Sequence, residues 1–165
     1  MLNIDEIEIR EIKVEEEMFL SDLLYEAIYQ SDITKSFTKE VINVSEVQVY
    51  IKNYGTKKDD YCLVADLNGQ IVGGVWVRVL AGEIKGYGNI DDKTPEFAIS
   101  VYSEYRNQEI GVLLMKKMIS YLTHNGYFQS TLSVQKENYA VKMYKKLGFE
   151  IIGENEEDFL MLLKL

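Results

Sequence analysis

The feature that most constrains this chain is a polar turn that joins an extended apolar stretch, Glu96–Val101, to a strongly apolar helix that begins at Ile110. A loop that opens directly into a helix leaves the first helical N–H groups unpaired, at the positive end of the helix dipole. An anion can sit there, and Gly111 has no Cβ to keep a phosphate group away from the backbone. The turn therefore predicts an anion site, although strand-to-helix turns of this kind also occur in α/β proteins that bind no anion.

The periodicity of apolar residues predicts a mixed α/β chain. Alternating or continuous apolar runs indicate strands at 7–12, 61–67, 71–79, 96–101, 131–134, 149–152 and 159–163. Helical spacing indicates helices at 14–29, at 47–53 with a capping box at 45–48, from Ile110 to about His124, and from Asn138 to Gly148.

Glycines mark the turns and one unusual strand. Asn68-Gly69 is the preferred dipeptide for a tight hairpin between the second and third strands. Gly73 and Gly74, inside the third strand, indicate a bulge or a close backbone approach. Residues 82–95 form a loop that could border a pocket. Its Gly86-Tyr-Gly88 segment begins like a dinucleotide-binding fingerprint, but it lacks the third glycine and precedes no helix, so we reject that interpretation.

The composition predicts one domain, residues 1–165, and limits its partners. The net charge of −9 opposes binding to nucleic acid or to an anionic membrane. It favours cationic partners such as amines or basic peptides, although acidic surfaces also serve solubility. The single Cys62 and the single His124 read as structural residues, so we expect no metal site. No run approaches the roughly 18 apolar residues of a membrane span, and we expect a cytoplasmic protein.

Two motifs, together with the order β-α-α-β-β-β-α-β-α-β-β, resemble the GNAT acetyltransferase superfamily, which uses acetyl-CoA. Arg106-Asn-Gln-Glu-Ile-Gly111, preceded by Tyr105, is similar to the family's Arg/Gln-x-x-Gly-x-Gly/Ala turn. The later segment 132–149 is similar to the family's Asn-x-x-Ala-x-x-x-Tyr-x-x-x-Gly-Phe pattern.

Glu109 departs from the family, because it stands where the turn's first glycine is expected. If that position needs a positive φ, a residue other than glycine costs on the order of 1 kcal/mol. A carboxylate there could also repel a pyrophosphate. Because backbone N–H groups do most of the phosphate binding, we expect Glu109 to face solvent and leave binding intact.

The resemblance implies an α/β (α+β) fold with a mixed, mostly antiparallel sheet of about seven strands, flanked by about four helices and split between strands 4 and 5. Acetyl-CoA is expected to lie in the split, its pantetheine arm paired with β-strand backbone and its pyrophosphate on the turn. The cofactor-binding residues that the resemblance implies are Ile99, Val101, Arg106, Asn107, Gln108, Glu109, Ile110, Gly111, Val112, Asn138 and Tyr144.

The same resemblance implies transfer of an acetyl group to a primary amine by direct attack on the thioester. The backbone N–H near Val101 is the expected oxyanion donor. Tyr144 matches the tyrosine that protonates the CoA thiolate; without the resemblance it reads as a core residue. Glu96 sits where many members place a carboxylate that draws the amine proton through water; the other interpretation is an edge-strand charge. Arg106 reads as a solvated loop side chain that could touch a phosphate, and Asn138 as a helix cap.

Two alternatives stay open at this point. The chain could be a non-catalytic CoA-binding or regulatory module, with Glu109 as a sign of relaxed constraint, although the presence of Tyr144 favours an enzyme. The donor could be another acyl-CoA. The acceptor, a small-molecule or peptide amine, is expected to be chosen by residues 82–95 and 31–43, where Glu83, Asp91 and Asp92 attract a cation or are ordinary solvated charge. Homodimers are frequent in the family.

Overall fold

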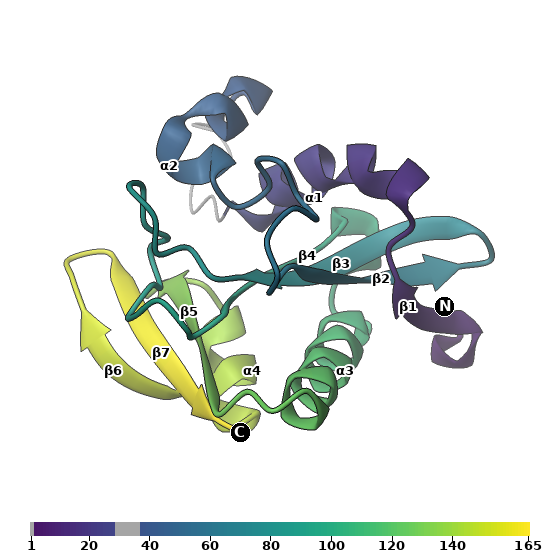
Figure 1. Cartoon of the computed structure of the whole chain (residues 1–165). Coiled ribbons are helices and arrows are strands. Elements are labelled where there is room, and N and C mark those ends of the chain that lie inside the picture. Colours follow the sequence, from purple (N-terminus) through teal and green to yellow (C-terminus); the bar gives the residue numbers. More distant parts are fainter. Residues whose placement is uncertain (1, 29–36) are drawn as a thin grey trace.

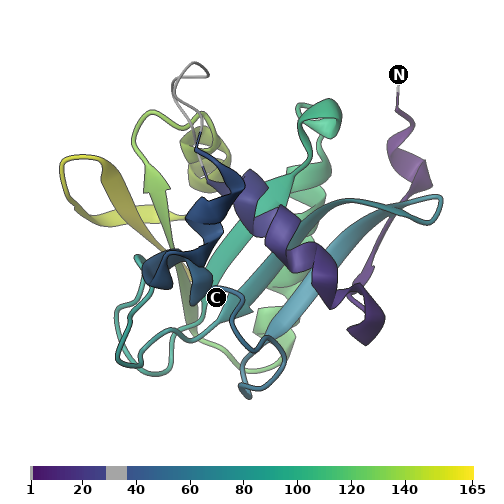
Figure 2. The ribbon, with the colours of Figure 1, turned by 90° about the horizontal axis from the view of Figure 1, so that it is seen from above.

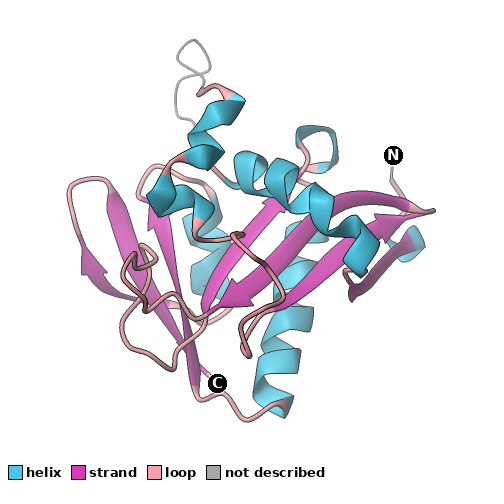
Figure 3. Cartoon of the chain, turned by 45° about the horizontal axis from the view of Figure 1, so that its top comes forward, coloured by secondary structure: helices cyan, strands magenta, loops and turns pink. Residues whose placement is uncertain are grey.

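A computed structural model describes residues 2–28 and 37–165 as a seven-stranded sheet with helices on both faces (Figure 1). Figure 3 shows the strands, in magenta, lying between helices, in cyan. The strands are β1 Ile7–Glu11, β2 Tyr61–Leu67, β3 Gln70–Arg78, β4 Glu96–Val101, β5 Gln129–Gln135, β6 Glu150–Glu154 and β7 Asp158–Lys164. The α-helices are α1 Leu20–Ala27, α2 Ser45–Gln48, α3 Ile110–His124 and α4 Ala140–Lys146, and short 3₁₀ helices span Ile4–Glu6, Val14–Phe19, Lys39–Asn43 and Ser103–Tyr105.

The order of strands in the sheet is β1-β2-β3-β4-β5-β7-β6. Every neighbouring pair is antiparallel except β4 and β5, which are parallel and are in register only at Glu96 and Thr131. Beyond that pair the two strands diverge, and β5, β7 and β6 turn away from the rest of the sheet (Figure 1). This confirms the mixed, mostly antiparallel sheet with a split between the fourth and fifth strands.

The β2–β3 hairpin explains the glycines of the third strand. Asn68 and Gly69 have φ values of 51° and 91°, as a two-residue hairpin turn with positive φ at both positions requires. A Cβ at Gly73 would lie 2.9 Å from the carbonyl oxygen of Ser100, and one at Gly74 would lie 2.8 Å from Leu23. The register of the hairpin also shifts between Ala65 and Asp66. The bulge and the close approach that the sequence predicted are therefore both present.

Each face of the sheet has its own core. On one face, α3 and α4 pack over a large cluster that includes Phe97, Leu114 and Met161. On the other face, α1 and the segment after α2 pack over a smaller cluster around Trp76 and Leu80. Figure 2 shows α1 lying across the strands on this second face. Alternate residues of β4 consequently face different cores.

The N-terminal third differs from the helices that the sequence predicted. Residues 14–19 form a 3₁₀ helix, and α1 continues from it only to Ala27. The predicted capping box is wrong, because Ser45 is the first residue of α2 and no side chain caps that helix. The predicted helix 47–53 is a series of hydrogen-bonded turns after the four-residue α2. Residues 29 and 31–36 of the predicted segments lie outside the described residues.

Candidate active site

The turn before α3 uses two left-handed residues that are not glycine. Asn107 has φ 60° and Glu109 has φ 69°, so the positive φ that the family's glycine suggested is present here in a glutamate. The Glu109 side chain is exposed, as expected. The first helical hydrogen bond runs from Leu113 N–H to the Glu109 carbonyl. The N–H groups of the first helical residues, Ile110 to Val112, therefore remain at the positive end of a helix of 15 residues.

Beyond Glu96, the edge of β4 that faces β5 has no strand paired with it. Tyr102 donates its N–H to Val72 in β3, so that residue's backbone faces β3. Because backbone direction alternates along a strand, the backbone groups of Ile99 and Val101 face the opposite way, toward β5. Since β5 has already diverged there, these groups have no neighbouring strand to pair with. The free edge ends close to the turn that opens α3.

Arg106 closes that turn instead of lying free in solvent. Its Nε donates to the carbonyl oxygen of Val101 at 2.8 Å, and its Nη2 contacts the Glu26 carboxylate at 3.1 Å. The interpretation of Arg106 as a solvated loop side chain is therefore wrong. Its guanidinium joins the end of β4 to α1. The Val101 N–H points to the β5 side, where no described strand pairs with it.

Tyr144 lies on α4, in the core that α3 and α4 cover. Its ring meets Phe149 edge to face at 5.8 Å, and Phe149 meets Phe97 of β4 at 5.7 Å, so aromatic contacts connect α4 to β4. Burial raises the pKa of its hydroxyl above the ordinary tyrosine value. α4 also approaches α3, because a Cβ at Gly111 would lie 3.6 Å from the sulfur of Met143.

Asn138 caps α4, as predicted. Its Oδ1 accepts a hydrogen bond from Ala140 N–H at 2.9 Å. Asn138 stands two residues before Ala140, whereas the family pattern has its asparagine three residues before the alanine. The match to that pattern therefore rests on Ala140, Tyr144 and the Gly148-Phe149 pair.

Glu96 is a buried carboxyl on a central strand, so the edge-strand interpretation is wrong. It is only 2% exposed and lies on the α1 side of the sheet, where Tyr50 donates a hydrogen bond to its Oε2. Its Oε1 has no hydrogen-bond partner among the described residues. Burial raises the pKa of Glu96 to about 7, although the hydrogen bonds from Tyr50 and the Gly88 backbone act in the opposite direction.

Sequence reasoning missed both Tyr50 and the purpose of Gly86 and Gly88. A Cβ at Gly86 would lie 2.1 Å from Glu96 Oε1, and one at Gly88 would lie 3.0 Å from the carboxyl carbon. The Gly88 carbonyl accepts a hydrogen bond from Thr131 Oγ1 at 2.6 Å. The two glycines thus allow the loop to lie against the carboxyl. The unassigned Gly-x-Gly pattern was the one available signal; nothing in the sequence connects position 50 with position 96.

The acidic residues of the 82–95 loop are exposed, and one of them shapes the loop. The Asp91 carboxylate accepts hydrogen bonds from Lys93 N–H at 2.9 Å and from Thr94 N–H at 2.6 Å, which lowers its pKa. Glu83 and Asp92 are solvent-exposed. Asp91 therefore stabilises the conformation of the loop.

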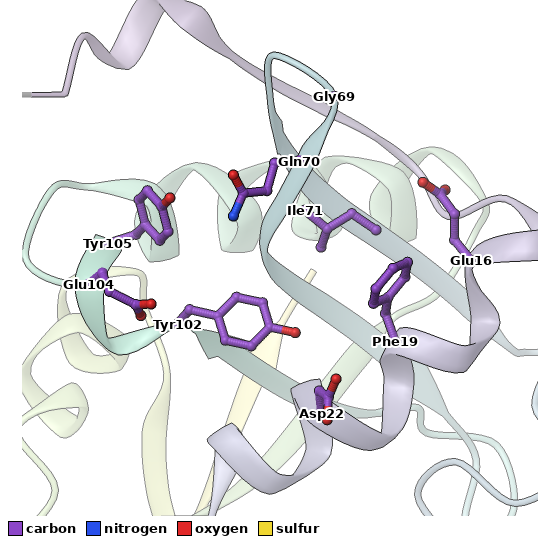
Figure 4. A pocket seen from close by; sticks show the side chains of 9 residues that line it. All are labelled: Glu16, Phe19, Asp22, Gly69, Gln70, Ile71, Tyr102, Glu104 and Tyr105. Carbon is purple, nitrogen blue, oxygen red and sulfur yellow. The ribbon is translucent and has the colours of Figure 1, made fainter.

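A separate hollow of about 430 Å³ lies beside the β2–β3 turn (Figure 4). None of the predicted site residues lines it. It has three carboxylates at its rim, of which Glu16 is paired with Arg10 at 2.8 Å. Its walls are formed by Glu16, Phe19, Asp22, Gly69, Gln70, Ile71, Tyr102, Glu104 and Tyr105.

The remaining candidates are structural. Cys62 is 1% exposed, and burial raises the pKa of its thiol. His124 ends α3 with its Nδ1 at 2.7 Å from the Ser120 carbonyl oxygen. Within residues 2–28 and 37–165, no group of three or more His, Cys, Asp or Glu side chains is placed to hold a metal ion. Over the same ranges, no helix is both long and apolar enough to cross a membrane.

A free strand edge that leads into a helix N-terminus, with a buried tyrosine on one face of the sheet and a buried carboxyl on the other, is the arrangement expected of an acetyltransferase. Residues 25–149 match the Acetyltransferase (GNAT) family, and the chain belongs to that family. The predicted family is therefore confirmed.

Individual relatives agree with this assignment. N-acetylaspartate synthetase from Danio rerio is 33% identical over 88 residues, which is 50% of this chain and 31% of that protein, so the chain spans about a third of this relative's length. The PaiA N-acetyltransferase from Thermoplasma acidophilum, solved with coenzyme A, has a TM-score of 0.69 and 21% identity, covering 96% of this chain and 99% of that one. The spermidine/spermine N-acetyltransferase SpeG from Vibrio cholerae has a TM-score of 0.65 and 17% identity, covering 97% and 94%. The two structures show the shared fold.

Proposed function

We propose that this protein transfers the acetyl group of acetyl-CoA to a primary amine, which attacks the thioester directly. The observation that carries the proposal is the divergence of β4 from β5 beside the N-terminus of α3. Acetyl-CoA supplies the acetyl group as a reactive thioester. The free edge at Ile99 and Val101 suits the amide-bearing pantetheine arm, which can pair with it as an added strand.

The turn and the first residues of α3 suit the pyrophosphate. Their N–H groups converge on the positive end of the helix dipole, and Gly111 adds no side chain there. The proposed cofactor residues beyond β4 are Arg106, Asn107, Gln108, Glu109, Ile110, Gly111, Val112, Asn138 and Tyr144. Among them, Arg106 is proposed to act by fixing the turn, because its guanidinium is bonded to Val101 and Glu26.

Three groups are proposed to perform the chemistry. The N–H of Val101 donates a hydrogen bond to the thioester oxygen as that oxygen gains charge. The Tyr144 hydroxyl gives its proton to the departing sulfur, and its raised pKa keeps it protonated until then. Glu96 takes the amine proton, through water, from the opposite face of the sheet.

The supporting feature of Glu96 is its environment. A general base is most effective when its pKa lies near the working pH, and the Glu96 pKa of about 7 meets that condition. Its Oε1 is free to accept a proton, because only Oε2 is engaged. The carboxyl is covered by the loop at Gly86 and Gly88, so proton transfer by way of water fits better than direct contact with the amine.

The names of the relatives agree on amine acetylation and differ in the acceptor. The Danio rerio relative is named for its product, N-acetylaspartate, and the Vibrio cholerae enzyme for its acceptors, spermidine and spermine. A screen of acetyl-CoA-dependent thiol release over amino acids including aspartate, polyamines, aminoglycosides and N-terminal peptides tests the proposal. We expect release with at least one amine class, and acetylated product by mass spectrometry.

Calorimetry separates the catalytic proposal from the non-catalytic alternative. We expect acetyl-CoA to bind with a Kd of micromolar order or somewhat weaker. Binding without thiol release for any amine would instead support a regulatory module. Absence of binding at millimolar acetyl-CoA would contradict both the donor and the site. Comparison of acetyl-CoA with longer acyl-CoA donors identifies the acyl group.

A further inference from the structure

The segment that follows α2 is fixed on the sheet by side chains of β3. The indole N–H of Trp76 donates to the Tyr50 carbonyl at 3.1 Å. Arg78 Nη1 donates to the carbonyls of Val49 at 3.0 Å and Lys52 at 2.7 Å. The guanidinium also forms a bidentate ion pair with Asp60, and both side chains are only 1% exposed. Hydrogen bonds to residues 49, 50 and 52 therefore fix the backbone around Tyr50, and with it the direction of the Tyr50 side chain.

The Tyr50 hydroxyl connects Glu96 to the loop above it. It accepts a hydrogen bond from Tyr87 N–H at 2.9 Å and donates to Glu96 Oε2. The direction of both bonds is fixed, because a backbone N–H can only donate and the phenol has a single proton to give. Oε2 must therefore accept, and Oε1 is left as the oxygen that can take up a proton. Gly86 packs against Oε1 without a side chain, since any Cβ there would clash with that oxygen.

We propose that Tyr50 is a positioning residue that holds the Glu96 carboxyl by its Oε2 atom. Oε1 is then the atom that accepts the proton of the amine. Tyr50 also links the Gly86–Gly88 loop to that carboxyl. The proposal rests on the function proposed above, in which Glu96 is the base. It assigns Tyr50 no contact with either substrate.

The other groups around Glu96 leave Tyr50 as its principal side-chain partner. Arg78 in β3 is the residue paired with Glu96 in the sheet, but the Arg78 guanidinium points to Asp60 and to backbone carbonyls. From β5, Thr131 bonds the Gly88 carbonyl. From the loop, the Tyr87 ring stacks on Tyr50 at 6.4 Å. No ion pair joins Glu96 to a cation within the described ranges. Loss of the Tyr50 hydroxyl removes a hydrogen bond to the ionised form, which raises the pKa of Glu96.

The test is Tyr50→Phe, with the pH dependence of kcat/KM and the ¹³C NMR titration of the Glu96 carboxyl as readouts. We expect both to move to higher pH by on the order of one unit, so that activity drops about fivefold at pH 7 and recovers in alkaline buffer. The KM for acetyl-CoA should not change. Tyr54→Phe is the matched control, because Tyr54 is a neighbouring tyrosine whose hydroxyl bonds the Val77 carbonyl at 3.3 Å and does not touch Glu96.

The outcomes separate the possibilities. Equal loss of activity at every pH, or an unmoved Glu96 titration, overturns the role of Tyr50. If neither wild type nor variant acetylates any amine, the proposed function fails, while the NMR titration still decides whether Tyr50 controls the carboxyl. Should Tyr50→Phe not fold, difluorotyrosine incorporated at position 50 replaces it. Its more acidic hydroxyl is a stronger donor and should shift the Glu96 titration to lower pH; no shift would contradict the proposal.

Discussion

Glu109 adopts a backbone conformation that favours glycine. At φ 69° a residue with a Cβ costs on the order of 1 kcal/mol relative to glycine. We expect Glu109→Gly to raise the free energy of unfolding by about that amount, because it relieves the strain. Urea denaturation measures the change. Glu109→Gln keeps the strained backbone and removes the charge, so it should not be stabilised; a gain of the same size in both variants would assign the effect to charge instead.

Tyr144 is a buried tyrosine whose ring packs edge to face against Phe149. We expect Tyr144→Phe to lower kcat about 100-fold, the scale of a lost general acid, with little change in CoA affinity by calorimetry. Tyr121→Phe is the control, because Tyr121 stacks on Tyr61 and lies outside the proposed site. Turnover of Tyr144→Phe equal to that of the control would remove the assignment.

At the scale of elements, a substitution at the start of α3 can test ligand binding without disturbing the fold. A Cβ at Gly111 would meet only Met143, at an ordinary 3.6 Å, and the position has no positive φ. Gly111→Ala should therefore fold and gain about 0.5–1 kcal/mol of stability from helix propensity. Its affinity for CoA should fall, because the methyl group occupies space proposed for the pyrophosphate. Gly153→Ala in β6 serves as the control for calorimetry, and unchanged CoA affinity in Gly111→Ala would place the phosphates elsewhere.

The segment between α2 and β2 depends on one buried ion pair. Removal of Asp60 would leave the Arg78 guanidinium buried without its counter-charge, so Asp60→Ala should lower the free energy of unfolding by about 3–5 kcal/mol. Asp22→Ala breaks the exposed contact with Lys39 at 3.9 Å, and its effect should stay within about 0.5 kcal/mol. Chemical denaturation compares the two, and equal losses would contradict the special role of the buried pair.

At the scale of the whole molecule, the burial of Glu96 makes the free energy of unfolding depend on pH. Its pKa is raised from 4.5 to about 7, so the folded protein binds a proton more tightly than the unfolded chain. The stability from this group is complete below pH 4.5 and is lost as the pH rises through about 7, by on the order of 3 kcal/mol in total. Glu96→Gln cannot titrate, so its unfolding free energy should decline less than that of wild type between pH 4.5 and 7.5. Parallel stability profiles would show that Glu96 does not titrate in this range.

The molecule divides its proposed chemistry between the two faces of the sheet. Tyr144 belongs to the core under α3 and α4, whereas Glu96 lies with Tyr50 on the α1 side. The gap in strand pairing between β4 and β5 is where groups on the two faces can reach the same substrate. Cofactor and amine can therefore approach from opposite sides. The choice of amine and the homodimer expected from the resemblance stay predictions.

Residues close in sequence carried the information for most elements and for the cofactor turn. The apolar periodicity located β4, α3 and the closing strands, and Asn68-Gly69 located the hairpin, because these patterns act within a few residues. The pattern was weaker where tertiary packing decides conformation. Val14–Phe19 forms a 3₁₀ helix in place of the predicted α-helix. After α2, turns replace the predicted helix, and this segment is held by distant side chains such as Trp76 and Arg78.

By itself, the sequence determined the family, the order of elements and the turn at Glu109, because all three depend on local pattern and motif spacing. Only the tertiary structure decided what surrounds Glu96. The carboxyl meets Tyr50, Gly86 and Gly88, and Gly88 is in turn bonded by Thr131. Tyr50 and Thr131 lie tens of positions away from Glu96 in the sequence, so no local pattern relates them. Burial and the desolvation that raises the pKa of Glu96 arise only when the sheet brings these segments together.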